Sequence, residues 1–195
     1  MNKYFQPNSK GAFWYGAGEV GVKKGADDPR VKAGVGIGYG RVVNVTPMAQ
    51  AIRMVEALTD KKRLTGSLTK AEYNQVANII AKEAEYRTQY GAVDYQQYWM
   101  ADIEKVLQAT GKTAGELGAI GILKARDVLV NERISTRKYG WLAKVGVSEV
   151  LKDYDGSDTK PALDVGAEYH RPLSNLTQFS NEASASAILQ DNAEY

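Results

Sequence analysis

Residues 16 to 21, GAGEVG, have the G-x-G-x-x-G spacing of a loop that brings its backbone close to a pyrophosphate. Such a loop binds phosphate when a strand enters it and a helix leaves it, because the helix N-terminus supplies aligned N–H groups and a favourable dipole. The residues that follow, VKKGADDPR, contain turn formers and no helical run. A protein-kinase glycine loop instead needs Val two places after the third Gly, where this chain has Lys23. We therefore expect no nucleotide site, and the glycines need another explanation.

The segment DYDGSD places Asp153, Asp155 and Asp158 in one loop. Three carboxylates suit a hard cation such as Ca²⁺, but the spacing lacks the register and the final Glu of an EF-hand loop. An acidic hairpin turn is the favoured interpretation, and calcium binding at these three residues is left open.

The single histidine, His170, stands beside Arg171 and is a candidate general base with an electrostatic partner. The favoured interpretation is a residue at a strand end, before the turn at Pro172. There is no Cys, which excludes disulfides, thiolate metal sites and thiol nucleophiles. No paired carboxylates, nucleophile with a base, or metal-ligand spacing stands out, so we expect no catalytic, cofactor-binding or metal-binding residues and no enzymatic activity.

Two further segments have a binding interpretation and a structural one. The aromatic residues of YRTQYGAVDYQQYW, among them Trp99, are candidates for stacking on a sugar or peptide, but at helical spacing they favour helix–helix contacts. The segment LKARDVLVNERISTRK is basic at its end and is a candidate for contact with phosphate or lipid headgroups. A solvated helix face leading into a strand is the default interpretation.

Composition limits the classes of protein. The chain has 195 residues, 25 Lys plus Arg and 23 Asp plus Glu, a net charge of +2 that does not indicate a nucleic-acid partner. The opening MNKYFQPNSK has no apolar signal region, and no run of 18 apolar residues occurs. We expect either a cytoplasmic protein or a mature chain from which a signal peptide has been removed.

Alternation with a period of two predicts five strands. In VKAGVGIGYGRVVNV, apolar residues from Val31 to Val45 share one face, interrupted by Arg41, while Gly34, Gly36, Gly38 and Gly40 share the other. The same pattern occurs in AFWYGAGEVGV, KYGWLAKVGVSEVL, PALDVGAEYHR and LTQFSNEASASAIL. The sequence therefore predicts a β-hairpin over residues 12 to 46 and three antiparallel strands over residues 138 to 190.

Between these strands the period changes to 3.6, and residues 47 to 134 are predicted to form a four-helix insert. Thr46 is the expected cap of the first helix, with Pro47 at its first position. Capping boxes are expected at Thr69 with Glu72 and at Thr113 with Glu116. The third helix is expected to begin at Asp94 and to end before Gly111, and the fourth to end near Asn131. The predicted fold class is α+β, with amphipathic antiparallel strands interrupted by helices.

The strands resemble those of bacterial outer-membrane β-barrel proteins, whose lipid side is apolar with aromatic girdles and whose lumen side is polar and small. In water-soluble sheets glycine is scarce, whereas here it recurs in strand after strand, mostly opposite the apolar face. The stretches that carry the resemblance are AFWYGAGEVGV, VKAGVGIGYGRVVNV, KYGWLAKVGVSEVL and LDVGAEYHRPLS. The resemblance implies a non-enzymatic component in passage, structure or assembly, located in the outer membrane. Its implied partners are the lipid bilayer or detergent, and further strands from the same chain, an oligomer or a periplasmic partner.

Five strands are fewer than the about eight that close a small barrel. The resemblance therefore implies a piece of a larger barrel or a subunit of an oligomeric one. The family's last strand ends in an aromatic residue; Tyr195 matches this, but the preceding QDNAE departs from the alternation. Barrels of this family keep short turns on the periplasmic side, which implies a periplasmic helical insert. The alternative is a soluble α+β binding module, cytoplasmic or periplasmic, whose helices cover the apolar face of the sheet.

Overall fold

The computed structural model describes residues 2–6, 11–25, 29–152 and 161–189. The fold is α+β, as predicted, with a six-stranded antiparallel sheet and four α-helices. The chain divides into two units by its internal contacts. We call residues 1–43, 138–171 and 178–195 the sheet unit, and residues 44–137 and 172–177 the helical unit.

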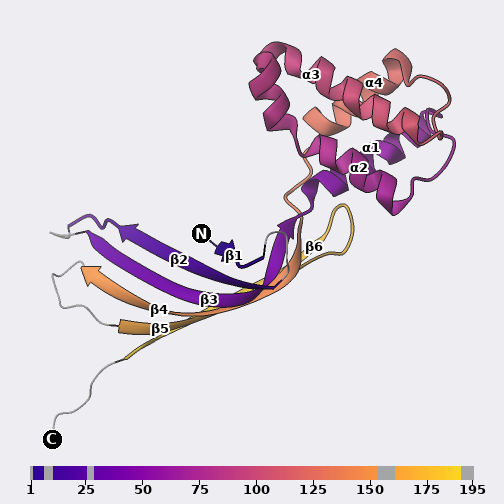
Figure 1. Ribbon diagram of the computed structural model, residues 1–195. Coiled ribbons are helices and arrows are strands. Elements are labelled where there is room, and N and C mark those ends of the chain that lie inside the picture. The colour runs from indigo at the N-terminus through magenta and orange to yellow at the C-terminus, as the bar shows by residue number, and fades with distance from the viewer. Residues whose placement is uncertain (1, 7–10, 26–28, 153–160, 190–195) are drawn as a thin grey trace, which may run out of the picture. The chain divides into compact units, whose positions relative to one another are not determined.

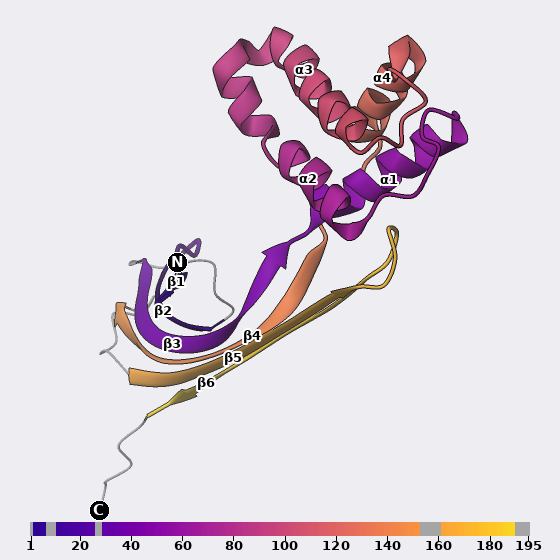
Figure 2. The same cartoon turned by 45° about the vertical axis from the view of Figure 1, so that its right-hand side comes forward.

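The sheet contains β1 (Asn2–Tyr4), β2 (Ala12–Gly21), β3 (Arg30–Asn44), β4 (Lys138–Lys152), β5 (Pro161–Pro172) and β6 (Gln178–Ile188), in that spatial order. Figure 1 shows the five long strands side by side, and Figure 2 shows that they curve along their length. The five predicted strands are confirmed, and the short β1 was not predicted. The sheet is open, because β1 and β6 form its two edges in the described part of the chain.

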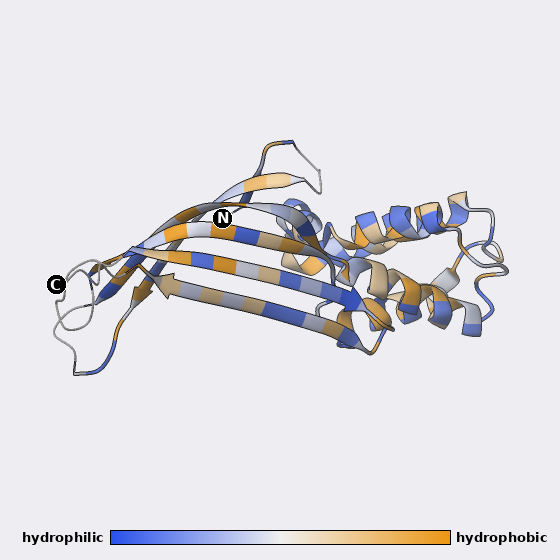
Figure 3. Ribbon diagram, turned by 90° about the horizontal axis from the view of Figure 1, so that it is seen from below, coloured by the Kyte–Doolittle hydropathy of each residue, from blue (hydrophilic) through white to orange (hydrophobic). Residues whose placement is uncertain are grey.

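The register of the ladders brings residues of the same kind together on each face. Gly16 of β2 pairs with Val35 of β3, and Trp14 pairs with Ile37. In the ladder between β4 and β5, Trp141 pairs with Tyr169. Since side chains alternate along each strand, this register collects the apolar residues, with Gly16 and Gly18 of β2, on one face. The glycines of β3, β4 and β5 lie with most polar residues on the other face. Figure 3 shows the alternation as hydrophobic and hydrophilic blocks along the strands.

The helical unit contains α1 (Thr46–Asp60), α2 (Lys70–Ile80), α3 (Glu83–Ala109) and α4 (Gly118–Arg126), followed by a π-helical turn, Asp127–Asn131. The predicted capping box is confirmed at α2, where Glu72 N donates to Thr69 Oγ1 and Thr69 N donates to Glu72 Oε2. The helices share one hydrophobic core that includes Met54, Leu58, Val76, Trp99, Ile103, Leu107 and Val128. Each described residue of this core belongs to the helical unit.

Thr46 does not cap α1, contrary to the prediction. Its hydroxyl donates to Asn44 Oδ1 at 2.6 Å and accepts from Arg137 N at 2.9 Å. Val45 N also donates to the carbonyl of Arg137, at 2.7 Å. The two ends of the helical insert are thereby hydrogen-bonded to each other, which lets β3 and β4 remain neighbours in the sheet although the insert separates them in sequence.

The predicted starts of the third and fourth helices were also wrong. α3 begins at Glu83, and Gly91, at φ 79° and ψ 165°, interrupts it with a kink; the sequence signal at Asp94 marks only its second part. α4 begins after Leu117, whose N–H donates to Glu104 Oε1 of α3 at 2.8 Å. A carboxylate from another helix thus replaces the expected cap by Thr113, which instead lies in a β-bridge with Leu64. None of the helices in the described ranges is long and apolar enough to cross a membrane.

Candidate functional site

One face of the sheet carries exposed apolar side chains on all five long strands, and we call it the apolar face. Val35 and Ile37 in the middle of β3 are each 61% exposed. Side chains of this size in a strand centre are normally buried, and contiguous exposed patches of this kind mark interaction surfaces. The apolar face comprises Trp14, Val20, Val35, Ile37, Tyr39, Tyr139, Trp141, Val145, Val147, Leu151, Leu163, Val165, Tyr169 and Phe179.

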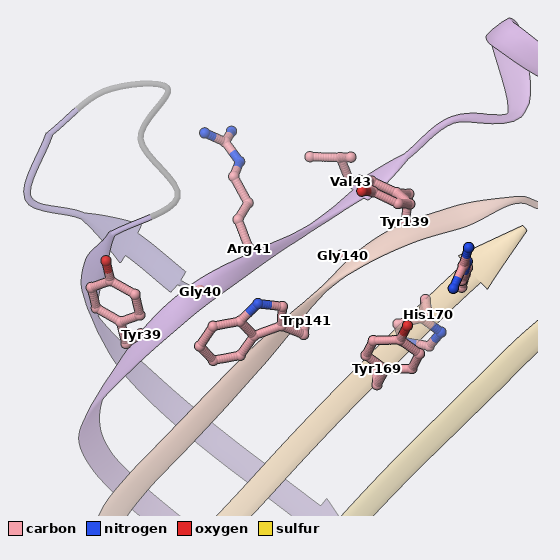
Figure 4. A pocket seen from close by; sticks show the side chains of 10 residues that line it. Tyr39, Gly40, Arg41, Val43, Tyr139, Gly140, Trp141, Tyr169 and His170 are labelled. Carbon is pink, nitrogen blue, oxygen red and sulfur yellow. The ribbon is translucent and has the colours of Figure 1, made fainter.

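Aromatic residues form a row across the apolar face, near the ends of the strands that lead to the helical insert in sequence. The rings of Tyr39 and Trp141 are 6.1 Å apart, and those of Tyr169 and Phe179 are 6.0 Å apart. Figure 4 shows Trp141 of β4 between Tyr39 of β3 and Tyr169 of β5. Each neighbouring strand from β3 to β6 therefore contributes an aromatic ring to this row, which we call the aromatic row.

A groove of about 440 Å³ opens along the aromatic row. Its walls include Tyr39, Tyr139, Trp141 and Tyr169, with Arg41 at its edge (Figure 4). Arg41 was expected to interrupt the apolar face, but its guanidinium carbon lies 4.8 Å from the ring centre of Tyr4 in β1. Tyr4 pairs with Phe13 and packs on its ring, on the side of the sheet opposite Val35 and Ile37, so the expected placement of Arg41 was wrong. The alternation is broken at Gly40, whose φ is 101°. The ring of Tyr4 thus offers this charge a cation–π partner, and His170 and Arg171 also line the groove.

The opposite side of the sheet, which we call the glycine face, is closely packed at β2, β3 and β4. Phe13 is fully buried there, and its ring lies where a Cβ on Gly38 would sit. Tyr15 occupies the equivalent space over Gly36. Gly36 and Gly38 are therefore explained by packing, because aromatic rings from β2 lie directly against the backbone there. The sequence showed the alternation of glycines but not which rings cover them.

Ion pairs occupy the part of the glycine face nearer β6. Lys32 Nζ lies 3.3 Å from Asp164 Oδ1, and Lys144 Nζ lies 3.8 Å from Glu168 Oε1. Ser186 of β6 donates to Asp164 at 2.6 Å.

His170 lies on the glycine face of β5, paired across the ladder with Gly140. It lies near the end of β5, before Pro172, as the favoured sequence interpretation held, and it is 1% exposed. Its imidazole lies between Glu168 of the same strand and Glu182 of β6. Sequence reasoning missed Glu182, although its position on the polar face of the last strand could be read from the alternation.

Calcium binding at Asp153, Asp155 and Asp158, which the sequence left open, concerns residues outside those that the structure describes.

The GAGEVG motif lies within β2, as predicted, and pairs along its length with β3. The N–H groups of successive residues in an antiparallel strand point in alternate directions, so they do not converge on one phosphate. Gly16 and Gly18 share a face with Trp14, and Gly21 points the other way. The motif is thus part of an amphipathic strand.

The aromatic segment of α3 is mostly occupied by internal contacts. Trp99 and Tyr95 are buried, and Trp99 Nε1 donates to the carbonyl of Ile79 at 2.9 Å. Tyr90 and Tyr98, on either side of the kink at Gly91, stack at 4.0 Å. The structural interpretation of this segment is therefore confirmed.

The basic segment that begins in the last turn of α4 makes local contacts. Lys124 pairs with Asp127 at 2.9 Å and with Glu132 at 3.4 Å. Arg53 of α1 binds Glu132 with two nitrogen atoms, at 2.8 and 3.1 Å. Arg126 donates to Gln96 at 2.7 Å. The segment leads into β4 at Lys138, as the default interpretation held, but these charges bind other side chains and do not form a freely solvated face.

Comparisons with protein-family models, with curated proteins and with solved structures find no match to this chain.

Proposed function

We propose that this chain contributes strands to a bacterial outer-membrane β-barrel, with the apolar face toward lipid and the glycine face toward the interior. Its role in this proposal is non-enzymatic, in passage, structure or assembly. The observation that carries the proposal is the apolar face, which is exposed on five adjacent strands while the opposite face carries glycines and ion pairs. Lipid-facing apolar residues alternating with polar interior residues are the defining pattern of such barrels.

The dimensions of the apolar face suit a bilayer. From Trp141 to Leu151, β4 extends about 33 Å at about 3.3 Å per residue. With a strand tilt of about 40°, this length covers about 25 Å along the membrane normal, the height of the apolar band in outer-membrane barrels. The aromatic row at one end of this band would lie at the level of the headgroups, where Trp and Tyr are enriched.

An open sheet edge is not stable in hydrocarbon, because each unpaired backbone group there costs several kcal/mol. The proposal therefore requires that β1 and β6 pair with further strands, either of the same protein or of other copies of this chain. The helical insert and the short turn after β5 join strands at the same end of the sheet. Since short turns of such barrels face the periplasm, we assign the helical insert to the periplasm.

The alternative is a soluble binding module whose helices cover the apolar face. In that case the apolar stripes of the helices would pack against the apolar side chains of the strands. The described core of the helical unit instead contains only its own residues, among them Met54, Leu58 and Trp99. Its self-contained core supports the membrane proposal over the alternative.

The three tryptophans allow a direct test. Trp141 and Trp14 lie on the apolar face, 51% and 46% exposed, whereas Trp99 is 1% exposed in the core of the helical unit. We would prepare three variants that each retain one tryptophan, with Phe at the other two positions, and fold them into phosphatidylcholine vesicles. Lipids brominated on their acyl chains should quench the fluorescence of Trp141 and Trp14 and leave Trp99, the matched control, unchanged.

A second measurement uses charge. Ile37→Arg should cost about 2–4 kcal/mol of folding free energy in the bilayer, as arginine does on the lipid face of a barrel near the midplane. The same replacement at Glu19, on the glycine face, should cost much less. Equal quenching of all three tryptophans, or a chain that stays folded and monomeric in plain buffer, would contradict the proposal.

A further inference from the structure

Three potential metal ligands meet on the glycine face, where β5 pairs with β6. Glu168 and His170 stand two residues apart on β5 and therefore point to the same side, and Glu182 reaches them from β6. His170 Nε2 lies 3.7 Å from Glu168 Oε2 and 3.5 Å from Glu182 Oε1. The three ligand atoms all lie within 4.8 Å of one another.

The imidazole of His170 is buried, with 1% of its surface exposed, and is oriented by its other nitrogen. Nδ1 lies 3.1 Å from Ser180 Oγ. Nε2 is buried and has no hydrogen-bond partner among the described residues, although it points between two carboxylates. When Nδ1–H donates to Ser180, the lone pair of Nε2 faces the carboxylates, which is the tautomer that a metal ion requires.

We propose that Glu168, His170 and Glu182 bind a divalent transition-metal ion of the Zn²⁺ class. Imidazole nitrogen and carboxylate oxygen are ordinary zinc ligands at about 2.0–2.2 Å, which places ligand atoms of a tetrahedral site about 3.3–3.6 Å apart. The two distances from Nε2, 3.5 and 3.7 Å, already match that spacing closely. Three protein ligands leave a fourth position for water.

Two lysines adjoin the site and affect it differently. Lys144 contacts Oε1 of Glu168, whereas the oxygen toward His170 is Oε2, so this carboxylate can bind a metal and keep its lysine. Lys138 contacts Oε1 of Glu182 at 3.2 Å, the same oxygen that faces His170. Lys138 therefore competes with the metal for Glu182, and its removal should strengthen metal binding.

A bound ion would link β5 to β6, the edge strand of the described sheet. Its ligands come from both strands, so binding would resist separation of β6 from β5. This role does not depend on the proposed function, because the site faces the glycine side whether or not the apolar face meets lipid.

The test is a titration of the full chain, prepared without a polyhistidine tag, with ZnCl₂ in detergent micelles by calorimetry. We expect one saturable site. His170→Gln and Glu168→Gln should weaken Zn²⁺ binding by more than about 100-fold, since they remove ligands, and Ser180→Ala by about tenfold, since it removes the group that orients the imidazole. Lys138→Gln should bind more tightly than the unsubstituted chain.

Asp164→Asn is the matched control, because Asp164 is another carboxylate of the same face paired with Lys32 and Ser186. Its Zn²⁺ affinity should equal that of the unsubstituted chain. A Co²⁺ titration gives a second measurement: a tetrahedral visible absorption band should appear and should be absent in His170→Gln. Far-ultraviolet circular dichroism of each variant, compared with the unsubstituted chain, establishes that it is folded. No saturable binding, or binding that folded His170→Gln retains, would overturn the proposal.

Discussion

The ring of Tyr15 on β2 occupies the space that a side chain on Gly36 of β3 would need. A Cβ built on Gly36 would lie 2.6 Å from Tyr15 Cε1 and Cζ, and it would also contact the carbonyl oxygen of Val145 on β4. The carbonyl belongs to the strand backbone and cannot move aside as a flexible side chain can. This relationship explains why a strand centre, where glycine is normally unfavourable, has glycine at this position.

Gly36→Ala should therefore destabilise the sheet by about 1–3 kcal/mol, the usual cost of overpacking. Gly18→Ala on the apolar face is the matched control, since no described atom lies within 4 Å of its added Cβ. This second change should be neutral or stabilising by about 0.4–1 kcal/mol. Urea unfolding in micelles, followed by circular dichroism, measures the free energy of unfolding of both variants.

A larger side chain should have a larger effect on the glycine face than on the apolar face. Gly36→Leu is expected to lower the free energy of unfolding far more than Val35→Leu does. Equal tolerance at the two positions would argue against a packed glycine face.

Residues 44 to 137, expressed alone, should fold. Their core is built from their own side chains, and the two ends of the segment are joined by hydrogen bonds between Val45, Thr46 and Arg137. We expect a helical circular dichroism spectrum in plain buffer, a cooperative thermal transition, and blue-shifted emission from the buried Trp99. A random-coil spectrum would show that these helices depend on the strands.

The stability of the helical unit should fall in acid through Glu72. A hydrogen bond from Lys112 at 2.6 Å, together with the N–H of Thr69, lowers the pKa of Glu72 from 4.5 to about 2. Because the folded-state pKa is the lower one, the stabilisation is complete above about pH 4.5 and is lost as pH falls toward 2.

Glu72→Gln keeps an oxygen that can accept from Thr69 but removes the charge, so its unfolding free energy should depend less on pH over this interval. Lys112→Met should act in the same direction, because it removes the partner that lowers the pKa. Thermal unfolding of each variant between pH 2 and 6 is the measurement. If Glu72→Gln loses as much stability in acid as the unsubstituted chain, the contact between Glu72 and Lys112 does not cause that loss.

The chain should not bind nucleotides through GAGEVG. The glycines are committed to β2, and their N–H groups alternate in direction along the ladder with β3. Calorimetric titration with NAD, FAD or ATP at millimolar ligand should give no saturable heat. A heat of binding that disappears in Gly18→Val would refute both the strand assignment and the surface derived from it.

The sequence by itself determined the five long strands and, except at Arg41, which of their side chains share a face, because alternation with a period of two is a local property of the chain. It predicted the Thr69 capping box for the same reason, since both partners lie within one helical turn. It also separated the helices from the strands by the change of period.

Only the tertiary structure decided the features that depend on distant residues. α4 begins where a carboxylate from α3, Glu104, satisfies its first N–H, and no local pattern near Thr113 encodes that contact. β1 is a three-residue strand that exists because β2 is there to pair with it. His170 and Glu182 come from different strands, and their approach is fixed by the register of β5 against β6, which is set by the turn and by packing across the sheet rather than by either segment alone.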